Sequence, residues 1–159
     1  MTPTKIAVTN IGQIKNADVK FGDLTVFVGP QATGKSIFLQ LLKLVVDVPS
    51  IQNEFKRFGI DWEGKLGNLL ELYFGEGMSG IWKEGVSQLN VDGKDINLEV
   101  FAKGSKRKDK DERLFFIPAQ RVMSLRDGQT QPFSVYRSGD PFVLREFSEK
   151  LHQLVQNEF

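Results

Sequence analysis

The chemistry in this sequence is concentrated in eight consecutive residues. They read Gly29-Pro30-Gln31-Ala32-Thr33-Gly34-Lys35-Ser36 and match the phosphate-loop pattern G-x-x-x-x-G-K-[ST], also called Walker A, in full. In such a loop, successive backbone N–H groups and the positive end of the following helix surround phosphate oxygens, and glycines let the backbone come close. We therefore predict that all eight residues line a phosphate-binding site.

Two side chains of this loop have distinct expected roles. Lys35 is expected to reach the β- and γ-phosphates of a nucleotide and so to serve catalysis. The Ser36 hydroxyl is expected to be a ligand of Mg²⁺, because this cation prefers oxygen and keeps waters and phosphate oxygens in its shell.

The flanking residues provide the context that the motif requires. Residues 24–28 are predicted to form a strand that runs directly into the loop, and residues 35–46 are predicted to form a helix. That helix is apolar nearly all round, which is typical of a helix buried against a sheet, and Pro49 is expected to end it.

Further elements are predicted on both sides of this unit. Residues 5–8 and 17–21 read as opening strands, and residues 50–74 have helical spacing broken at Gly59, Gly64 and Gly67. Asp92-Gly93 predicts a type I′ hairpin turn between alternating apolar residues at 89–91 and 96–100. Residues 114–117 predict a buried central strand stopped by Pro118. Asp140-Pro141 predicts the start of a helix that runs nearly to the last residue.

Composition sets the class of the molecule. The chain has 159 residues, 40% of them apolar, which fits one folded domain over 1–159. Its net charge of +1 leaves no global field that would attract nucleic acid or a membrane. There is no Cys, no signal-like start and no run of the ~20 apolar residues needed to span a bilayer, so a cytoplasmic location is expected.

Two other phosphate-loop classes fit these residues less well. Asp61-Trp62-Glu63-Gly64 fits the D-x-x-G pattern of GTPases, but no Asn-Lys-x-Asp for guanine occurs in the chain. A small-molecule kinase is disfavoured because nothing resembles an acceptor site or a lid.

The first part of the chain resembles a known family of ATPases. Residues 4–46, with roughly 20 residues before the phosphate-loop strand, resemble the opening of RecF-, SMC- and OLD-like ATPase heads, a branch of the ABC ATPases. The likeness resumes at Phe116-Ile117-Pro118-Ala119-Gln120-Arg121. Gln31-Ala32 departs from it, since many relatives have Asn-Gly there, which puts the local turn geometry in doubt.

This resemblance implies a fold, cofactors and partners. The implied fold is an α/β phosphate-loop ATPase domain with a mixed sheet and flanking helices, incomplete relative to a full ABC/SMC-like head. The implied cofactors are ATP and Mg²⁺, and Gln120 would contact Mg²⁺ and the attacking water. The implied partners are a second copy or the missing half of the head, with DNA or a nuclease as further possibilities, for example in an antiphage system. The basic residues of the loop at 103–112 would suit contact with a DNA backbone, but Asp109, Asp111 and Glu112 dilute their charge and favour a solvated hairpin loop.

Hydrolysis by this chain alone is not expected. The class needs an Asp and a Glu at the end of an apolar strand, and no such acid pair occurs in the sequence. Asp47 follows an apolar run, but it lies twelve residues beyond Lys35 on the same helix, or roughly 18 Å away. An alternative function is therefore a non-hydrolysing nucleotide-binding or interaction module whose catalytic half lies elsewhere.

Overall fold

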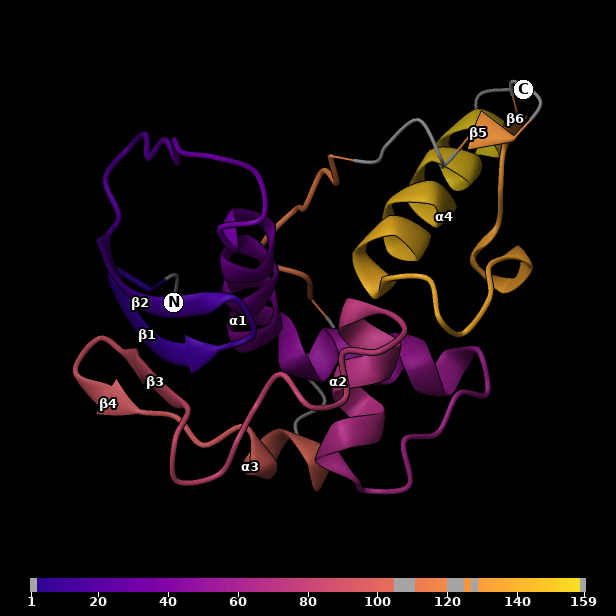
Figure 1. Ribbon diagram of the computed structural model, residues 1–159. Coiled ribbons are helices and arrows are strands. Elements are labelled where there is room, and N and C mark those ends of the chain that lie inside the picture. The colour runs from indigo at the N-terminus through magenta and orange to yellow at the C-terminus, as the bar shows by residue number, and fades with distance from the viewer. Residues whose placement is uncertain (1–2, 105–110, 120–124, 127–128, 158–159) are drawn as a thin grey trace.

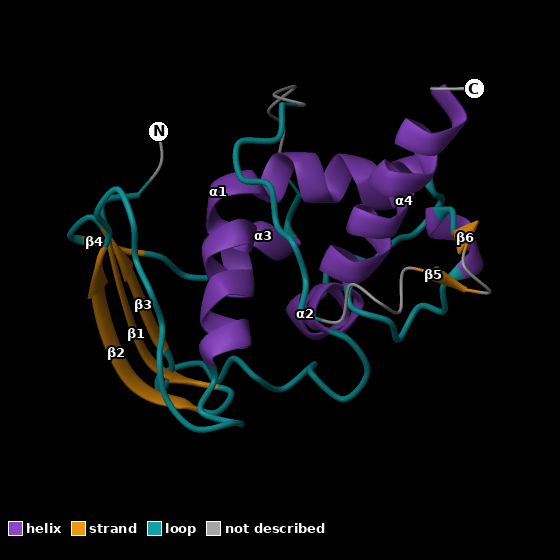
Figure 2. Cartoon of the chain, turned by 90° about the horizontal axis from the view of Figure 1, so that it is seen from above, coloured by secondary structure: helices purple, strands orange, loops and turns teal. Residues whose placement is uncertain are grey.

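The protein is a small α/β molecule with an antiparallel sheet on one side and helices on the other, as the computed structural model shows (Figures 1 and 2). The structure describes residues 3–104, 111–119, 125–126 and 129–157. Among these residues, no helix is both long enough and apolar enough to cross a bilayer.

The main sheet has four strands in the order β2-β1-β3-β4, namely β1 (Lys5–Ile11), β2 (Ile14–Lys20), β3 (Gln88–Val91) and β4 (Lys94–Asp95). Every pairing is antiparallel, and Val8 of β1 lies opposite Ala17 on one side and Leu89 on the other. Alternation places Ile6 and Val8 in the core because strand side chains point to opposite faces. The predicted opening strands are confirmed, whereas the expected mixed sheet is wrong for the described residues.

The turn between β3 and β4 is the predicted hairpin. Asp92 and Gly93 both have positive φ, 51° and 83°, which the type I′ turn requires at its two central positions. The strand after this turn is shorter than expected, because the chain bends into the short helix α3 (Glu99–Ala102). Of the alternating apolar residues that predicted a strand, Leu98 just before this helix is fully buried, whereas Val100 within it is 63% exposed.

Helix α1 (Lys35–Arg57) begins where the motif predicted and continues past the expected stop. Pro49 lies inside it, and Asp47 has non-helical angles, φ −119° and ψ 20°. Because the ring of Pro49 lacks an N–H and clashes with the carbonyl four residues earlier, the helix kinks instead of ending. Its two halves then bury different residues, with Phe38, Leu41 and Leu44 before the kink and Ile51 and Phe55 after it.

The remaining helices pack beside the second half of α1 through aromatic side chains. They are α2 (Leu66–Phe74), the 3₁₀ turn η2 (Phe133–Val135) and α4 (Phe142–Asn157), and the short hairpin β5 (Leu125–Arg126) and β6 (Gln129–Thr130) precedes η2. The helices expected within 50–74 and after Asp140 are confirmed, except that Gly67 lies within α2 and breaks nothing. Phe142 of α4 links these helices, since its ring centroid lies 4.9 Å from that of Phe55 in α1 and 5.7 Å from that of Tyr73 in α2.

Two predicted strands are wrong. Neither residues 24–28 nor residues 114–117 belong to a ladder with the rest of the described chain, and Leu24 lies in a bend. Their inward side chains pack on the core, as when Phe27 lies 5.1 Å from Phe38, while their outward apolar side chains face solvent. An apolar run alone does not make a strand, because a strand also needs a neighbour with which to pair.

Candidate phosphate-binding site

The loop at 29–36 joins an extended segment to the first turn of α1, on an open surface. Residues 29–33 are exposed and Gly34 is buried. Gly29, Ala32 and Gly34 all have positive φ, at 144°, 59° and 88°, so the backbone curls through conformations that favour glycine. The Gly34 carbonyl accepts the N–H of Phe38 at 2.8 Å, which starts the helix at the motif lysine.

The Lys35 ammonium is held by the loop itself. It donates to the Gly29 carbonyl at 2.8 Å, to the Thr33 hydroxyl at 3.1 Å and to the Pro30 carbonyl. The Thr33 hydroxyl in turn donates to the Pro30 carbonyl at 3.0 Å. These bonds hold a positive charge against the backbone of the loop.

The turn between β1 and β2 supports the loop from the side. Ile14 is buried, and its Cγ1 lies 2.6 Å from the position that a Cβ atom would take at Gly34. Gly12 donates its N–H to the Ile81 carbonyl at 3.1 Å and lies close to Ile37 of α1. The opening hairpin thus sets how closely the loop and the first helical turn approach the sheet, and only glycine fits at position 34.

The start of α1 provides one side chain that suits Mg²⁺, the hydroxyl of Ser36. Ser36 is exposed next to the loop, and a single hydroxyl is a sufficient protein ligand when phosphate oxygens and waters complete the shell. Within residues 3–104 and the later described segments, no group of three or more acidic or His side chains is arranged to hold a metal ion. Gln120 and Arg121 lie outside the described residues, so the predicted Mg²⁺ contact of Gln120 remains a prediction.

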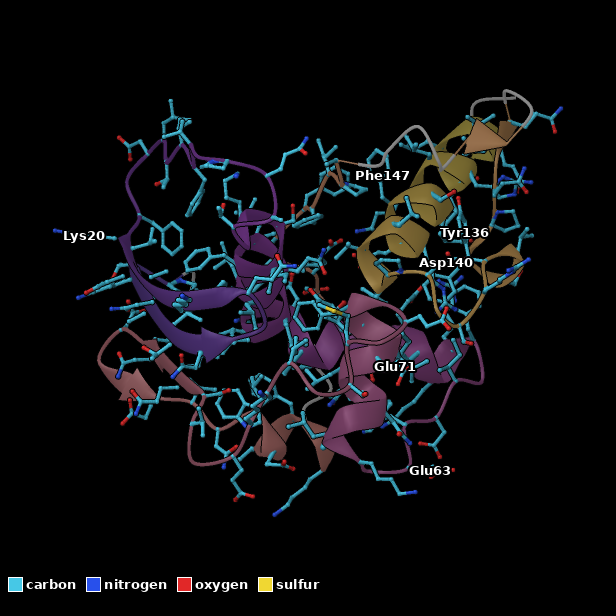
Figure 3. The ribbon with its side chains drawn as sticks, viewed as in Figure 1. Lys20, Glu63, Glu71, Tyr136, Asp140 and Phe147 are labelled. Carbon is cyan, nitrogen blue, oxygen red and sulfur yellow. The ribbon has the colours of Figure 1, made fainter. Side chains whose placement is uncertain are left out.

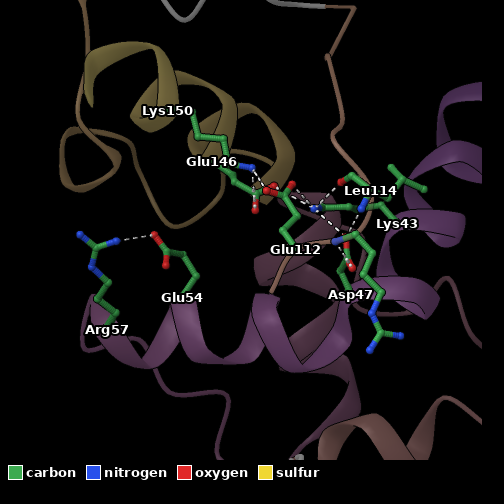
Figure 4. A network of polar contacts seen from close by, with 9 residues as sticks. Lys43, Asp47, Glu54, Arg57, Glu112, Leu114, Glu146 and Lys150 are labelled. Atoms are coloured by element: carbon green, nitrogen blue, oxygen red, sulfur yellow. Dashed lines mark hydrogen bonds and ion pairs between the residues drawn. The ribbon is translucent and has the colours of Figure 1, made fainter. Parts of the chain in front are cut away.

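A second polar centre lies further along α1, and the sequence analysis did not find it. We call it the charge cluster: Lys43, Asp47, Glu112, Glu146 and Lys150, from α1, the segment after the basic loop, and α4 (Figure 4). The fully buried Lys43 ammonium lies 3.0 Å from Asp47, 2.5 Å from Glu112 and 3.5 Å from Glu146. Lys150 adds ion pairs to Glu112 and Glu146.

The charge cluster also fixes the backbone of residues 113–114. The Asp47 carboxylate accepts the N–H groups of Arg113 and Leu114 at 2.9 and 3.0 Å, and Lys43 donates to the Leu114 carbonyl at 2.8 Å. Asp47 therefore holds a neighbouring segment and is not a free carboxylate for a metal. The sequence signals this cluster by a Lys and an Asp four residues apart within an otherwise apolar helix.

Burial and charge act in opposite directions on the groups of this cluster. Burial alone would lower the pKa of Lys43, but Glu146, Glu112 and Asp47 outweigh it and hold that pKa above its ordinary value. Burial likewise favours a higher pKa for Glu112, yet hydrogen bonds from Lys150 and Lys43 bring it below the ordinary value. For Glu146 burial prevails over both lysines, and the pKa is raised.

A cavity of about 470 Å³ lies at the kink of α1, away from the phosphate loop. Its walls include Val45, Val48, Ile96 and Phe101, and Asp111 and Arg113 lie at its charged side. No residue of the Walker A pattern lines it. The candidate site therefore rests on the loop backbone and Lys35 and not on a deep pocket.

Comparison with protein families, with curated proteins and with solved structures finds no match to this chain. The functional argument consequently rests on the residues of the loop and on their geometry.

Proposed function

We propose that residues 29–36 bind ATP together with Mg²⁺, and that the chain is the ATP-binding part of an ABC-, SMC- or OLD-like ATPase head. The placement of Lys35 carries this proposal. Its ammonium is held over a loop of left-handed and extended backbone that leads directly into a long buried helix. That arrangement of charge, backbone donors and helix terminus is suited to a polyphosphate.

Each part of the loop at 29–36 has its own role in this proposal. Backbone N–H groups of 29–36 would surround the phosphates, Lys35 would exchange its loop carbonyls for β- and γ-phosphate oxygens, and Ser36 would hold Mg²⁺. When bound, the metal would supply charge neutralisation at the terminal phosphates. In this proposal Gln120 contacts the metal and the attacking water, and the head works with a second copy or a completing half on DNA or beside a nuclease.

Binding is tested by calorimetry with MgATP on the full chain. We expect Lys35→Ala to weaken binding at least tenfold, or by about 1.4 kcal/mol, because the ammonium is the main fixed charge facing the phosphates. Lys20→Ala is the matched control, since this exposed lysine at the end of β2 projects away from the molecule (Figure 3). Equal affinities for the parent and Lys35→Ala, or no binding by the parent, would show that the loop is not a nucleotide site.

A non-hydrolysing nucleotide-binding module is the second candidate, and the contacts of Asp47 favour it. This carboxylate, the nearest match to a catalytic acid after an apolar run, is buried and already bonded to Lys43 and to two backbone N–H groups. We therefore expect the purified chain to bind ATP but to release phosphate far below the ~1 s⁻¹ typical of slow enzymes. Phosphate release is measured with Lys35→Ala as the blank, and turnover near that rate that depends on Lys35 would point to a catalytic acid we have not identified.

A further inference from the structure

Packing does not hold the curl of the loop at 29–36. Residues 29–33 are exposed, and Gly34 is the first buried residue of the loop. Ala32 nevertheless keeps a φ of 59°, a conformation that is unfavourable for a residue with a Cβ atom. Hydrogen bonds must therefore stabilise the curl.

One hydroxyl group makes two hydrogen bonds that close the loop. The Thr33 hydroxyl donates to the Pro30 carbonyl at 3.0 Å and accepts a hydrogen bond from the Lys35 ammonium at 3.1 Å. The first bond closes the turn between Pro30 and Thr33, and the second joins that turn to the lysine. Within the described chain, the other polar side chains of the loop, Gln31 and Ser36, make no hydrogen bond. Thr33 is therefore the side chain that links the curl of the loop to Lys35.

The same hydroxyl helps to order the Lys35 ammonium. A lysine has a long and flexible side chain, and immobilising such a side chain on binding lowers the affinity for a ligand. Here the ammonium has three acceptors, the carbonyls of Gly29 and Pro30 and the hydroxyl of Thr33. Only the hydroxyl belongs to a side chain, so it alone can be removed by substitution without altering the backbone.

We propose that Thr33 is a positioning residue for nucleotide binding, which closes the loop and holds Lys35 where the β- and γ-phosphates would meet it. The inference rests on the proposed nucleotide site. Its hydroxyl carries the role, so Thr33→Ser should preserve it. Thr33→Val keeps the branched shape of the side chain and removes only the hydroxyl, so it should lose the role.

Calorimetry with MgATP on the full chain tests the proposal. Thr33→Val should weaken binding by about 3- to 10-fold, the range for the loss of one hydrogen bond, and Thr33→Ser should stay within about twofold of the parent. Thr9→Val is the matched control, since Thr9 lies on β1, outside the loop. The melting temperature of Thr33→Val should match that of the parent, because Thr33 is exposed. A Thr33→Val protein that binds as tightly as the parent, or a Thr33→Ser protein that binds as weakly as Thr33→Val, would overturn the proposal.

The Lys35 ammonium provides a second readout that needs no ATP. Exchange of its protons with water, followed by NMR, should be at least about twofold faster in Thr33→Val than in the parent, because hydrogen bonds slow exchange. In Thr33→Ser and Thr9→Val the rate should stay close to that of the parent. Equal rates in the parent and Thr33→Val would overturn the role of Thr33 even if ATP binding weakens.

The two proposals fail in different ways. A parent that binds no ATP removes the nucleotide site itself. A parent that binds ATP through Lys35, with Thr33→Val binding equally well, removes only the role of Thr33.

Discussion

At the scale of single residues, Ala32 is the unusual member of the loop at 29–36. Its φ of 59° lies in the left-handed region, where a Cβ atom costs roughly 1–2 kcal/mol. Gln31-Ala32 is where the sequence departs from the ATPase loops that it resembles, and there only the local turn geometry was in doubt. The structure locates that doubt at Ala32, whose backbone adopts a conformation that favours glycine.

Replacing Ala32 by glycine should therefore relieve strain. We expect Ala32→Gly to leave the free energy of unfolding unchanged or to raise it by up to about 1 kcal/mol, since lost strain outweighs the added entropy of the unfolded chain. Ala17→Gly, within β2, should instead lower it by about 0.5–1 kcal/mol. Denaturant titration of both variants checks this, and an equal loss in the two would contradict the strain at Ala32.

At the scale of elements, one aromatic side chain links α4 to several of its neighbours. Phe142 is fully buried at its start, and its ring also lies 6.0 Å from that of Phe133 in η2. The ring thereby links α4 to the second half of α1, to α2 and to η2. The charge cluster is the other link between α4 and α1, and it acts through side chains of Glu146 and Lys150.

Truncation of this ring should loosen α4. We expect Phe142→Ala to lower the free energy of unfolding by about 3–5 kcal/mol, through lost burial and the cavity that remains. Leu154→Ala on the same helix is the control and should change it by less than about 0.5 kcal/mol, because Leu154 is 60% exposed. Thermal or denaturant unfolding measures both. A Phe142→Ala protein as stable as the control would show that this ring contributes little to holding α4.

At the scale of the whole molecule, the charge cluster makes stability depend on pH. The pKa of Glu112 is lowered on folding, so its contribution is complete above the ordinary value of 4.5 and is lost as pH falls through the lower, folded-state pKa. Glu146 acts in the opposite sense, because its raised pKa favours the protonated form in the folded protein. Lys43 remains charged throughout this acid range, because its pKa is held above its ordinary value.

The variant Glu112→Gln tests the contribution of Glu112 to the pH dependence of stability. We expect it to lower the free energy of unfolding near pH 7 by about 1–2 kcal/mol and to flatten the decline of stability below pH 4.5. Glu63→Gln removes an exposed pair with Lys65 and should leave the shape of the pH profile unchanged. Denaturant titrations across the acid range compare the three proteins. If the free energy of unfolding falls equally steeply with pH in the parent and in Glu112→Gln, Glu112 is not a source of the pH dependence.

The sequence by itself determined the features that depend on neighbouring residues. The start of α1 at Lys35, the Asp92-Gly93 turn and the first two strands follow from motif, turn chemistry and alternation, and all three are present. The loop at 29–36 was likewise recognisable as a candidate phosphate site, because its pattern is continuous in the chain.

Only the tertiary structure decided the features that depend on distant residues. Whether residues 24–28 and 114–117 form strands depends on a neighbour to pair with, and apolar character does not reveal that neighbour. Pro49 kinks α1 without ending it, because burial of Ile51 and Phe55 stabilises helix on its far side. Lys43 meets Glu112 and Glu146 only after folding, since 69 residues separate it from Glu112 and the attraction needs contact within about 4 Å.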